Sequence, residues 1–185
     1  MTRLLLDRLR RFGRDCAGVM TIEAVLVLPF LLWGFVALYV FFDAFRQQGI
    51  NLKASYTVAD MLSRKSDDVD MAYVNGLQRV LDFLTNSPVE TEVRITVVRY
   101  DGQNDALDLD WSATSGSHGR ITDANFALIA DEIPMMADGD SVIVVETWMT
   151  YRPFIDVGVP ETDMYNLIVT SPRFSPQLTW EGPGV

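Results

Sequence analysis

The chain has 185 residues, of which 49% are hydrophobic, and it carries 15 basic and 25 acidic side chains for a net charge of −10. A charge balance this acidic argues against nucleic acid as a partner, because nucleic-acid binding needs a basic face. The apolar content excludes a wholly disordered chain. Cys16 is the single cysteine, so no intrachain disulfide can form.

Residues 1–18 form a basic leader. Five arginines and two aspartates give this segment a balance of +3, whereas the rest of the chain carries −13. The five arginines are Arg3, Arg8, Arg10, Arg11 and Arg14. Because positive charge beside a membrane helix stays in the cytoplasm, the leader predicts a cytoplasmic N-terminus and an acidic C-terminal part across the membrane.

Residues 19–42 form an apolar run with one charged residue, Glu23. As a helix the run can cross a hydrocarbon core about 30 Å thick, and it exceeds the roughly 7–15 apolar residues of a cleaved secretory signal. We therefore expect a retained transmembrane helix. A carboxylate within a membrane costs about 2.5–3.5 kcal/mol, so we expect Glu23 either to have a partner or to lie near the interface. Pro29 is expected to be a tolerated kink.

Residues 43–65 are expected to extend the same helix beyond the membrane. Apolar positions recur there at steps of three and four, which is typical of an amphipathic helix. They are Phe42, Phe45, Gly49, Leu52, Tyr56, Ala59 and Leu62. The sequence predicts that this stripe lies on a sheet. The polar residues expected on the other side are Arg46, Gln47, Asn51, Lys53 and Ser55.

Residues 66–185 are expected to form an exterior domain. Residues 66–68 are a break with an N-cap signal, and the apolar spacing that follows predicts a second helix over residues 69–85. A short helix, capped at residues 122–123, is expected over residues 124–133.

After Pro88 the apolar period changes to two, which indicates strands. Residues 93–98 and 107–111 are separated by a polar turn and predict a hairpin. Residues 141–151 are rich in Val and Ile and predict a central strand.

A last extended segment is expected from about residue 165 to residue 180. Pro172 and Pro176 lie within it and confine it to a sheet edge or a bulge. The pattern as a whole predicts an α+β fold, in which a long N-terminal helix packs on a small antiparallel sheet with one or two further helices.

Gly18 lies five residues before Glu23. Cleavage after Gly18 would make Val19 the new N-terminus, with its ammonium about 6 Å along the helix axis from Glu23. The carboxylate could then pair with this ammonium or with that of a neighbouring subunit. Either pairing gives the acid a partner that an uncut chain lacks.

The basic leader, Gly18, Glu23 and the long apolar helix resemble the prepilin pattern of type IV pilins. The fuller string Gly18-Val-Met-Thr-Ile-Glu23-Ala-Val-Leu-Val-Leu-Pro29-Phe-Leu-Leu is more closely similar to the TadE/TadF/TadG group of the tight-adherence (Tad, or Flp) pilus system. The segment 56–64, Tyr-Thr-Val-Ala-Asp-Met-Leu-Ser-Arg, also resembles these proteins.

The resemblance implies a minor pseudopilin or pilus-assembly factor in a bacterial inner membrane, with its C-terminal domain in the periplasm. It implies processing by a prepilin peptidase between Gly18 and Val19. It also implies action with the major pilin, other pseudopilins, inner-membrane platform proteins and an assembly ATPase.

One departure leaves an alternative open. Ala24 stands where processed Tad pseudopilins often carry Tyr. The alternative is an uncleaved single-pass membrane protein whose periplasmic α+β domain binds an envelope or secretion partner.

The exterior domain shows no catalytic or metal-binding motif. An acidic cluster lacks the spacing of a calcium loop, and its members are Asp101, Asp105, Asp108 and Asp110. His118 is the only histidine and lies in a Gly/Ser loop. We therefore expect neither enzymatic activity, nor a cofactor, nor a metal ion.

Overall fold

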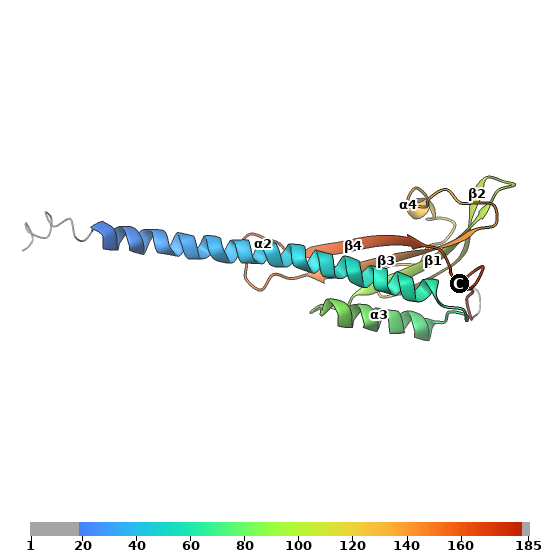
Figure 1. The fold of residues 1–185 in the computed structure, drawn as a ribbon, viewed down its shortest axis with the longest axis horizontal. Helices are drawn as coiled ribbons and strands as arrows, with labels where there is room; N and C mark the ends of the chain where they lie inside the picture. Colours follow the sequence, from blue (N-terminus) through green and yellow to red (C-terminus); the bar gives the residue numbers. More distant parts are fainter. Residues whose placement is uncertain (1–18, 183–185) are drawn as a thin grey trace, which may run out of the picture.

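The computed structural model of the chain describes residues 19–182. Helix α2 (Val19–Ser63) is a single helix of 45 residues, which corresponds to a length of about 67 Å. Its N-terminal half extends away from the rest of the chain, and its C-terminal half packs on a sheet domain (Figure 1).

The sheet has four antiparallel strands. They are β1 (Glu92–Asp101), β2 (Ala106–Ser115), β3 (Ser141–Tyr151) and β4 (Thr162–Thr170). Their order is β2-β1-β3-β4. This arrangement confirms the predicted α+β fold, the hairpin, the central position of residues 141–151 and the edge position of the last strand.

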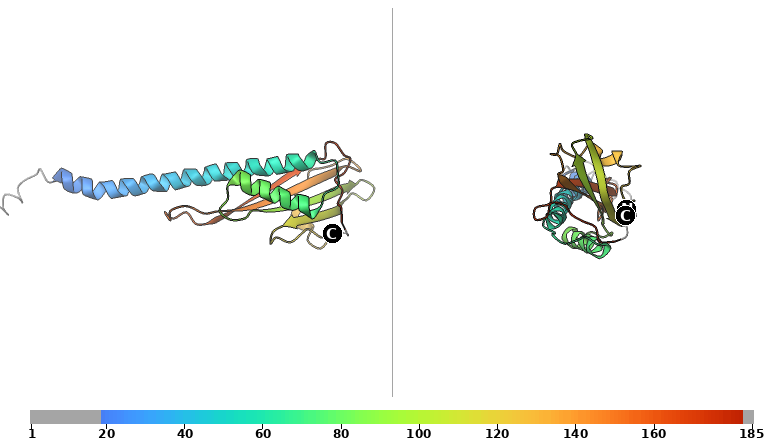
Figure 2. Two further views of the ribbon diagram at one scale, coloured as in Figure 1. Left: turned by 90° about the horizontal axis from the view of Figure 1, so that it is seen from below. Right: turned by 90° about the vertical axis from the view of Figure 1, so that its right-hand side faces the viewer.

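Two helices cover one face of the sheet. Helix α3 (Met71–Thr85) lies beside the C-terminal half of α2 (Figure 2). Their apolar side chains form the main core with alternate residues of the strands, including Val58, Leu62, Leu77, Leu81, Val93, Ile95, Ile143, Val145 and Ile168. The short helix α4 (Ala127–Ala130) contributes Ile129 to a smaller core on the opposite face, with Ile121 and Val144.

Several predicted boundaries were wrong. Helix α2 ends at Ser63 rather than at residue 65, and α3 begins at Met71. The N-cap of α3 is Asp70, whose carboxylate accepts a hydrogen bond from the Tyr73 N–H at 2.7 Å. The predicted cap at residues 66–68 is displaced because Val69 forms a bridge with Trp180, which holds Val69 in an extended conformation.

The buried face of α2 was also predicted wrongly. Phe42, Phe45 and Tyr56 of the expected stripe are exposed by 72%, 65% and 56%, and only its last turn is buried. Asn51 and Ser55, which were assigned to the solvent side, are 0% exposed. Ser55 and the amide nitrogen of Asn51 bond to strand residues, whereas the buried Asn51 Oδ1 atom has no hydrogen-bond partner among the described residues.

Strand β2 contains a bulge opposite Val97 and Val98. Regular alternation would place Leu109 and Trp111 on one face. The bulge instead places Trp111 in the main core and Leu109 in the smaller one. A bulge of this kind inserts one extra residue, here Asp110, into one strand of a pair.

The last strand and the short helix differ in length from the predictions. Strand β4 ends at Thr170, before Pro172 and Pro176, because proline cannot donate a hydrogen bond to the ladder. Helix α4 has four residues instead of ten, and its N-cap is Phe126 without a side-chain hydrogen bond.

Candidate functional site

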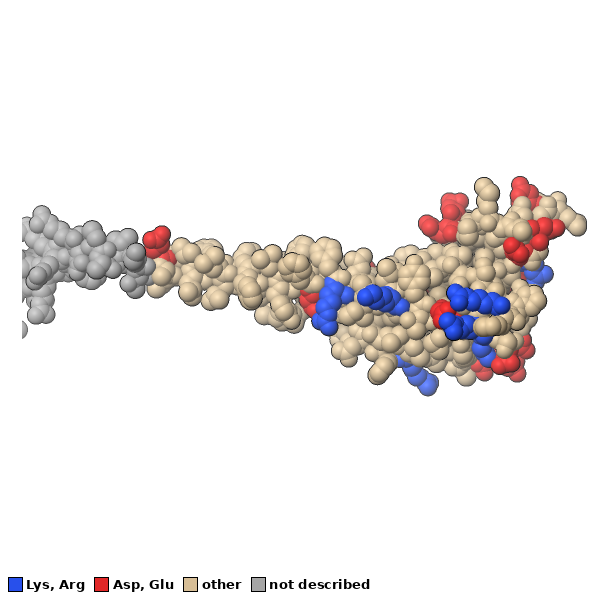
Figure 3. Space-filling view, viewed as in Figure 1, with Lys and Arg blue, Asp and Glu red and all other residues tan. Residues whose placement is uncertain are grey.

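The N-terminal half of α2 is apolar and unpacked. Its large side chains are exposed, for example Val25 by 67%, Phe30 by 76% and Phe35 by 69%. In the most apolar 18-residue window of the helix, 6% of the residues are buried. The helix is therefore long and apolar enough to span a membrane. The sequence has no charged residue between Glu23 and Asp43, and the face of the free half seen in Figure 3 is correspondingly without charge over most of its length.

The site residues predicted from the sequence fall into two groups. Gly18 and the leader arginines lie outside the described residues, and the arginines are Arg3, Arg8, Arg10, Arg11 and Arg14. Glu23 lies in the second turn of α2 as described and is exposed. Pro29 lies inside the helix, which continues through it.

Apolar residues continue along α2 outside its contact with the sheet, and Phe45 among them also borders a groove beside β4. This outer stripe consists of Phe42, Phe45, Gly49, Leu52 and Tyr56. Leu52 is 40% exposed, and a Cβ added at Gly49 would meet no atom within 4 Å. The predicted contact of the stripe with the sheet is therefore wrong for these five residues, which form an exposed surface of the helix.

The opposite side of α2 forms a polar seam with β3 and β4. The Ser55 hydroxyl lies 2.7 Å from the Thr147 hydroxyl and accepts a hydrogen bond from the Asn166 amide at 3.3 Å. The Asn51 amide donates to the Met164 carbonyl at 3.4 Å. Since buried polar groups need such partners, the seam fixes which side of α2 meets the sheet.

The junction between the two halves of α2 is tied to the sheet by Tyr151. Its hydroxyl, at the end of β3, donates to the Asp43 carboxylate at 3.2 Å or to the Val40 carbonyl at 3.4 Å. Four residues further along, the Gln47 amide donates to the Thr85 carbonyl at 2.7 Å. The packed half of the helix therefore begins at Val40, at the end of the apolar run.

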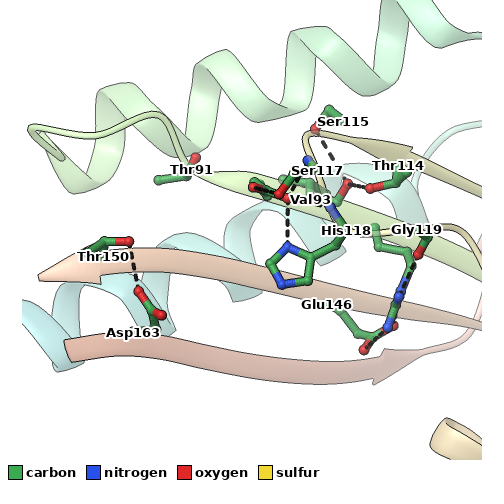
Figure 4. Close-up of polar contacts among 12 residues, drawn as sticks. Thr91, Val93, Thr114, Ser115, Ser117, His118, Gly119, Glu146, Thr150 and Asp163 are labelled. Atoms are coloured by element: carbon green, nitrogen blue, oxygen red, sulfur yellow. Dashed lines mark hydrogen bonds and ion pairs between the residues drawn. The ribbon is translucent and has the colours of Figure 1, made fainter.

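A second cluster lies on the sheet face opposite the helices (Figure 4). Arg94 on β1 donates two hydrogen bonds of 2.6 Å to the Glu146 carboxylate on β3, and a third of 2.7 Å to the Gly119 carbonyl. The two charged side chains are 10% and 2% exposed. Tyr165 on β4 donates to the same carboxylate at 2.9 Å. Burial and the Glu146 charge raise the pKa of the Tyr165 hydroxyl.

His118 joins this cluster from the loop after β2. Its ring stacks on Trp148 with centroids 4.1 Å apart, and Trp148 packs against Tyr165 at 5.4 Å. The His118 Nδ1 atom lies 2.6 Å from the Glu92 carboxylate, which also accepts hydrogen bonds from Ser117. Burial alone would raise the pKa of the Glu92 carboxyl, but the hydrogen bonds from His118 and Ser117 lower it below its ordinary value.

The loop approaches β1 closely at Gly116. This glycine has a φ of 121°, and a Cβ there would collide with the Glu92 side chain. Loop 116–119 is therefore held by its backbone, by the Glu92 carboxylate and by Arg94. The cluster fastens the loop to the sheet and leaves a row of aromatic rings on the surface.

The sequence reasoning missed this cluster. Arg94 and Glu146 each interrupt a strand of apolar residues, which is a signal for a buried ion pair. The acidic cluster near the hairpin turn has structural contacts instead. Asp101 accepts a hydrogen bond from the Gln103 N–H, and Asp110 pairs with Arg99 at 2.9 Å.

Within residues 19–182, no group of three or more His, Cys, Asp or Glu side chains is placed to hold a metal ion. Comparisons with protein-family models, with curated proteins and with solved structures give no significant match to this chain. The geometry of α2 and its sheet domain is therefore the basis for a functional conclusion.

Proposed function

We propose that the chain is a structural subunit of a Tad-type pilus or a related secretion system, a minor pseudopilin that is anchored in a bacterial inner membrane by residues 19–42. The observation that carries this proposal is the division of one continuous helix. Its first half is apolar and free, and its second half is fastened to a folded domain while it keeps an exposed apolar stripe.

The outer stripe is the surface expected of an assembling helix. It begins at Phe42, where the apolar run ends, and continues to Tyr56 along a side of α2 that the sheet does not cover. Helices associate through apolar side chains at steps of three and four. A neighbouring pilin helix could therefore contact the membrane half and the stripe without displacing the sheet domain.

The orientation follows from charge. The positive charge of the leader arginines supports a cytoplasmic leader and hence a periplasmic sheet domain. A prepilin peptidase on the cytoplasmic side would cut between Gly18 and Val19. The new ammonium at Val19 would pair with Glu23 of the same or a neighbouring subunit, because an acid in a membrane needs a partner. The major pilin, other pseudopilins and the platform proteins are the partners of this assembly.

The cleavage step is tested by N-terminal sequencing of the protein from membranes that contain the peptidase. We expect Val19 as the first residue of the wild type and no processing of Gly18→Leu. An uncut wild type would contradict the pseudopilin proposal.

The role of Glu23 is tested by counting pili on cells that carry Glu23→Ala. We expect fewer pili and unchanged or improved membrane insertion, since the substitution removes a charge from the apolar run. The matched control is Glu90→Ala, which removes an exposed glutamate of the sheet domain and should leave piliation normal. Normal pili with Glu23→Ala would contradict the pairing.

A second candidate function is that of an uncleaved anchor with a periplasmic binding domain. It is favoured by the row of rings of His118, Trp148 and Tyr165 on the face opposite the helices, because aromatic side chains are enriched in interfaces. Retention of the uncut leader, together with normal piliation after substitution of the outer stripe, would favour this function over the first.

A further inference from the structure

The loop between β3 and β4, residues 152–161, is the part of the sheet domain that reaches farthest along α2 toward its N-terminal end (Figures 1 and 2). Phe154 and Ile155 lie in it and are 59% and 46% exposed. The Phe154 ring contacts the Tyr39 ring edge to face, with centroids 5.4 Å apart. Tyr39 belongs to the apolar run, so the loop reaches the segment that is able to span a membrane.

The level of this contact can be placed along the helix. Tyr39 precedes Phe42, the last residue of the apolar run, by three residues, which is about 4.5 Å along the axis. A tyrosine near the end of a membrane helix lies in the interface between hydrocarbon and water. The loop that touches Tyr39 must therefore lie at the same depth.

An apolar groove connects the loop to the surface of the helix. It has a volume of about 180 Å³, and its lining includes Phe41, Phe45, Val159 and Met164. Phe41 also lines the hollow along the free half of α2. The surface that faces the hydrocarbon therefore continues into the groove.

Charged side chains border this apolar surface on the side of the sheet domain. Arg152 pairs with Glu161 at 2.9 Å across the base of the loop, and both are about half exposed. Arg46 on α2 is 73% exposed, one turn beyond Phe42. Arg46 lies 3.8 Å from Asp43, so each of these arginines has an acidic partner. The two ion pairs mark the level at which the surface changes from apolar to polar, as it does at the boundary between hydrocarbon and headgroups.

We propose that the β3–β4 loop is a second membrane contact, which inserts Phe154 and Ile155 into the outer interface of the bilayer and admits a lipid acyl chain to the groove beside α2. This inference rests on the proposed membrane span of residues 19–42. The loop and the helix together fix the depth and orientation of the sheet domain on the membrane.

The experiment measures the depth of fluorescent probes in vesicles. The full chain with Cys16→Ser receives one labelled cysteine at a time, and the vesicles contain phospholipids with a nitroxide quencher either near the headgroup or in the middle of the acyl chain. The three positions are Ile155→Cys in the loop, Leu31→Cys in the span and Met135→Cys at the far end of the domain. Met135 is fully exposed.

We expect the probe at position 155 to be quenched most by the shallow nitroxide, the probe at 31 by the deep one, and the probe at 135 by neither. Quenching at 31 without quenching at 155 would overturn the loop contact and leave the span intact. No quenching at 31 would overturn the span, and with it this inference.

A second variant tests the contribution of the phenylalanine. Phe154→Ser should reduce the quenching at position 155. The matched substitution Phe174→Ser, at a still more exposed phenylalanine of the far end (72% against 59%), should not. If the two variants reduce the quenching at position 155 equally, or if neither reduces it, the proposal is wrong.

Discussion

The two halves of helix α2 have the same backbone but opposite surroundings. In the first half, the side chains from Ile22 to Phe35 are almost all exposed, and in the second half Val58 and Leu62 are fully buried. The first half carries large side chains on every side, whereas the second half presents small and polar ones to the sheet. Helical propensity is therefore common to both halves, and the surface that each offers decides its environment.

The largest effect on stability is expected when a leucine is replaced by alanine in the second half of α2, and the same replacement in the first half serves as the comparison. Leu62→Ala removes a fully buried side chain from the main core and should lower the free energy of unfolding of the sheet domain by about 2–5 kcal/mol. Leu31→Ala, at a position that is 67% exposed, should leave it unchanged. The measurement is urea unfolding in detergent, followed by the near-ultraviolet circular dichroism of the tryptophans, of which Trp111 is buried in the core.

Equal losses for the two leucines would contradict this comparison. Such a result would mean that the free half of α2 contacts the sheet domain in solution. The apolar surface of residues 22–39 would then be covered in the isolated protein.

Acid should distinguish the sheet domain, on which the second half of α2 packs, from the free apolar half. The pKa of Glu92 is lowered in the folded domain, so its contribution to stability is complete above the ordinary value of about 4.5 and is lost as the pH falls below it toward the lowered pKa. Glu92→Gln should cost about 1.5–3 kcal/mol at neutral pH, since it weakens hydrogen bonds to a charged group. It should also flatten this part of the pH profile.

The apolar half does not pack on the sheet domain, so its association with membranes should not depend on Glu92. Thermal unfolding from pH 7 to pH 3 should shift for the wild type more than for Glu92→Gln, while sedimentation with vesicles stays constant for both. Identical pH profiles of the two proteins would exclude Glu92 as the titrating group.

The sequence was sufficient to predict the element types but not the face of α2. Its second half has apolar residues on both sides, with Phe45 and Tyr56 on one and Val58 and Leu62 on the other. Periodicity alone led to the prediction that the side with the larger side chains faces the sheet. The hydrogen bonds of Ser55 to Thr147 and to Asn166 on β4 fix which side of α2 faces the sheet. They join residues about 90 to 110 positions apart in the sequence.

The same limit applies to the cluster on the opposite face. The predicted bounds of strand β3 are correct, and Glu146 is a charged residue within this apolar strand. Its partner Arg94 and the loop residue His118 are brought to it only by the pairing of β1 with β3 and by the return of the loop. The bulge in β2 likewise depends on the register with β1, which a single strand does not reveal.

A smaller effect is expected at the boundary between the halves. Tyr151→Phe removes the hydroxyl that bonds to Asp43 or Val40, and it should cost about 0.5–1.5 kcal/mol. Hydrogen exchange of the amides around residues 40–47 should become faster, because the helix is less firmly held at that level. Tyr56→Phe, at an exposed tyrosine of the same helix, is the control. Unchanged exchange with Tyr151→Phe would show that packing alone fixes the junction.

The smallest effect on stability is expected at the outer stripe, and there the consequence is for assembly. Leu52→Ser should change the free energy of unfolding by less than about 0.5 kcal/mol, since Leu52 is 40% exposed and faces away from the sheet. The same variant should reduce the amount of protein that sediments with sheared pili, because it places a hydroxyl in the surface that a neighbouring helix would cover.

The matched control is Leu84→Ser on α3, where the leucine is 38% exposed. Both substitutions remove a similar apolar area, but only Leu52 belongs to the stripe that continues the apolar run. A loss of sedimentation with Leu52→Ser alone would assign the second half of α2 two separate surfaces, one for the sheet and one for the neighbouring subunit. Equal sedimentation of the two variants would restrict assembly contacts to residues 19–42 and leave the exposed stripe without that role.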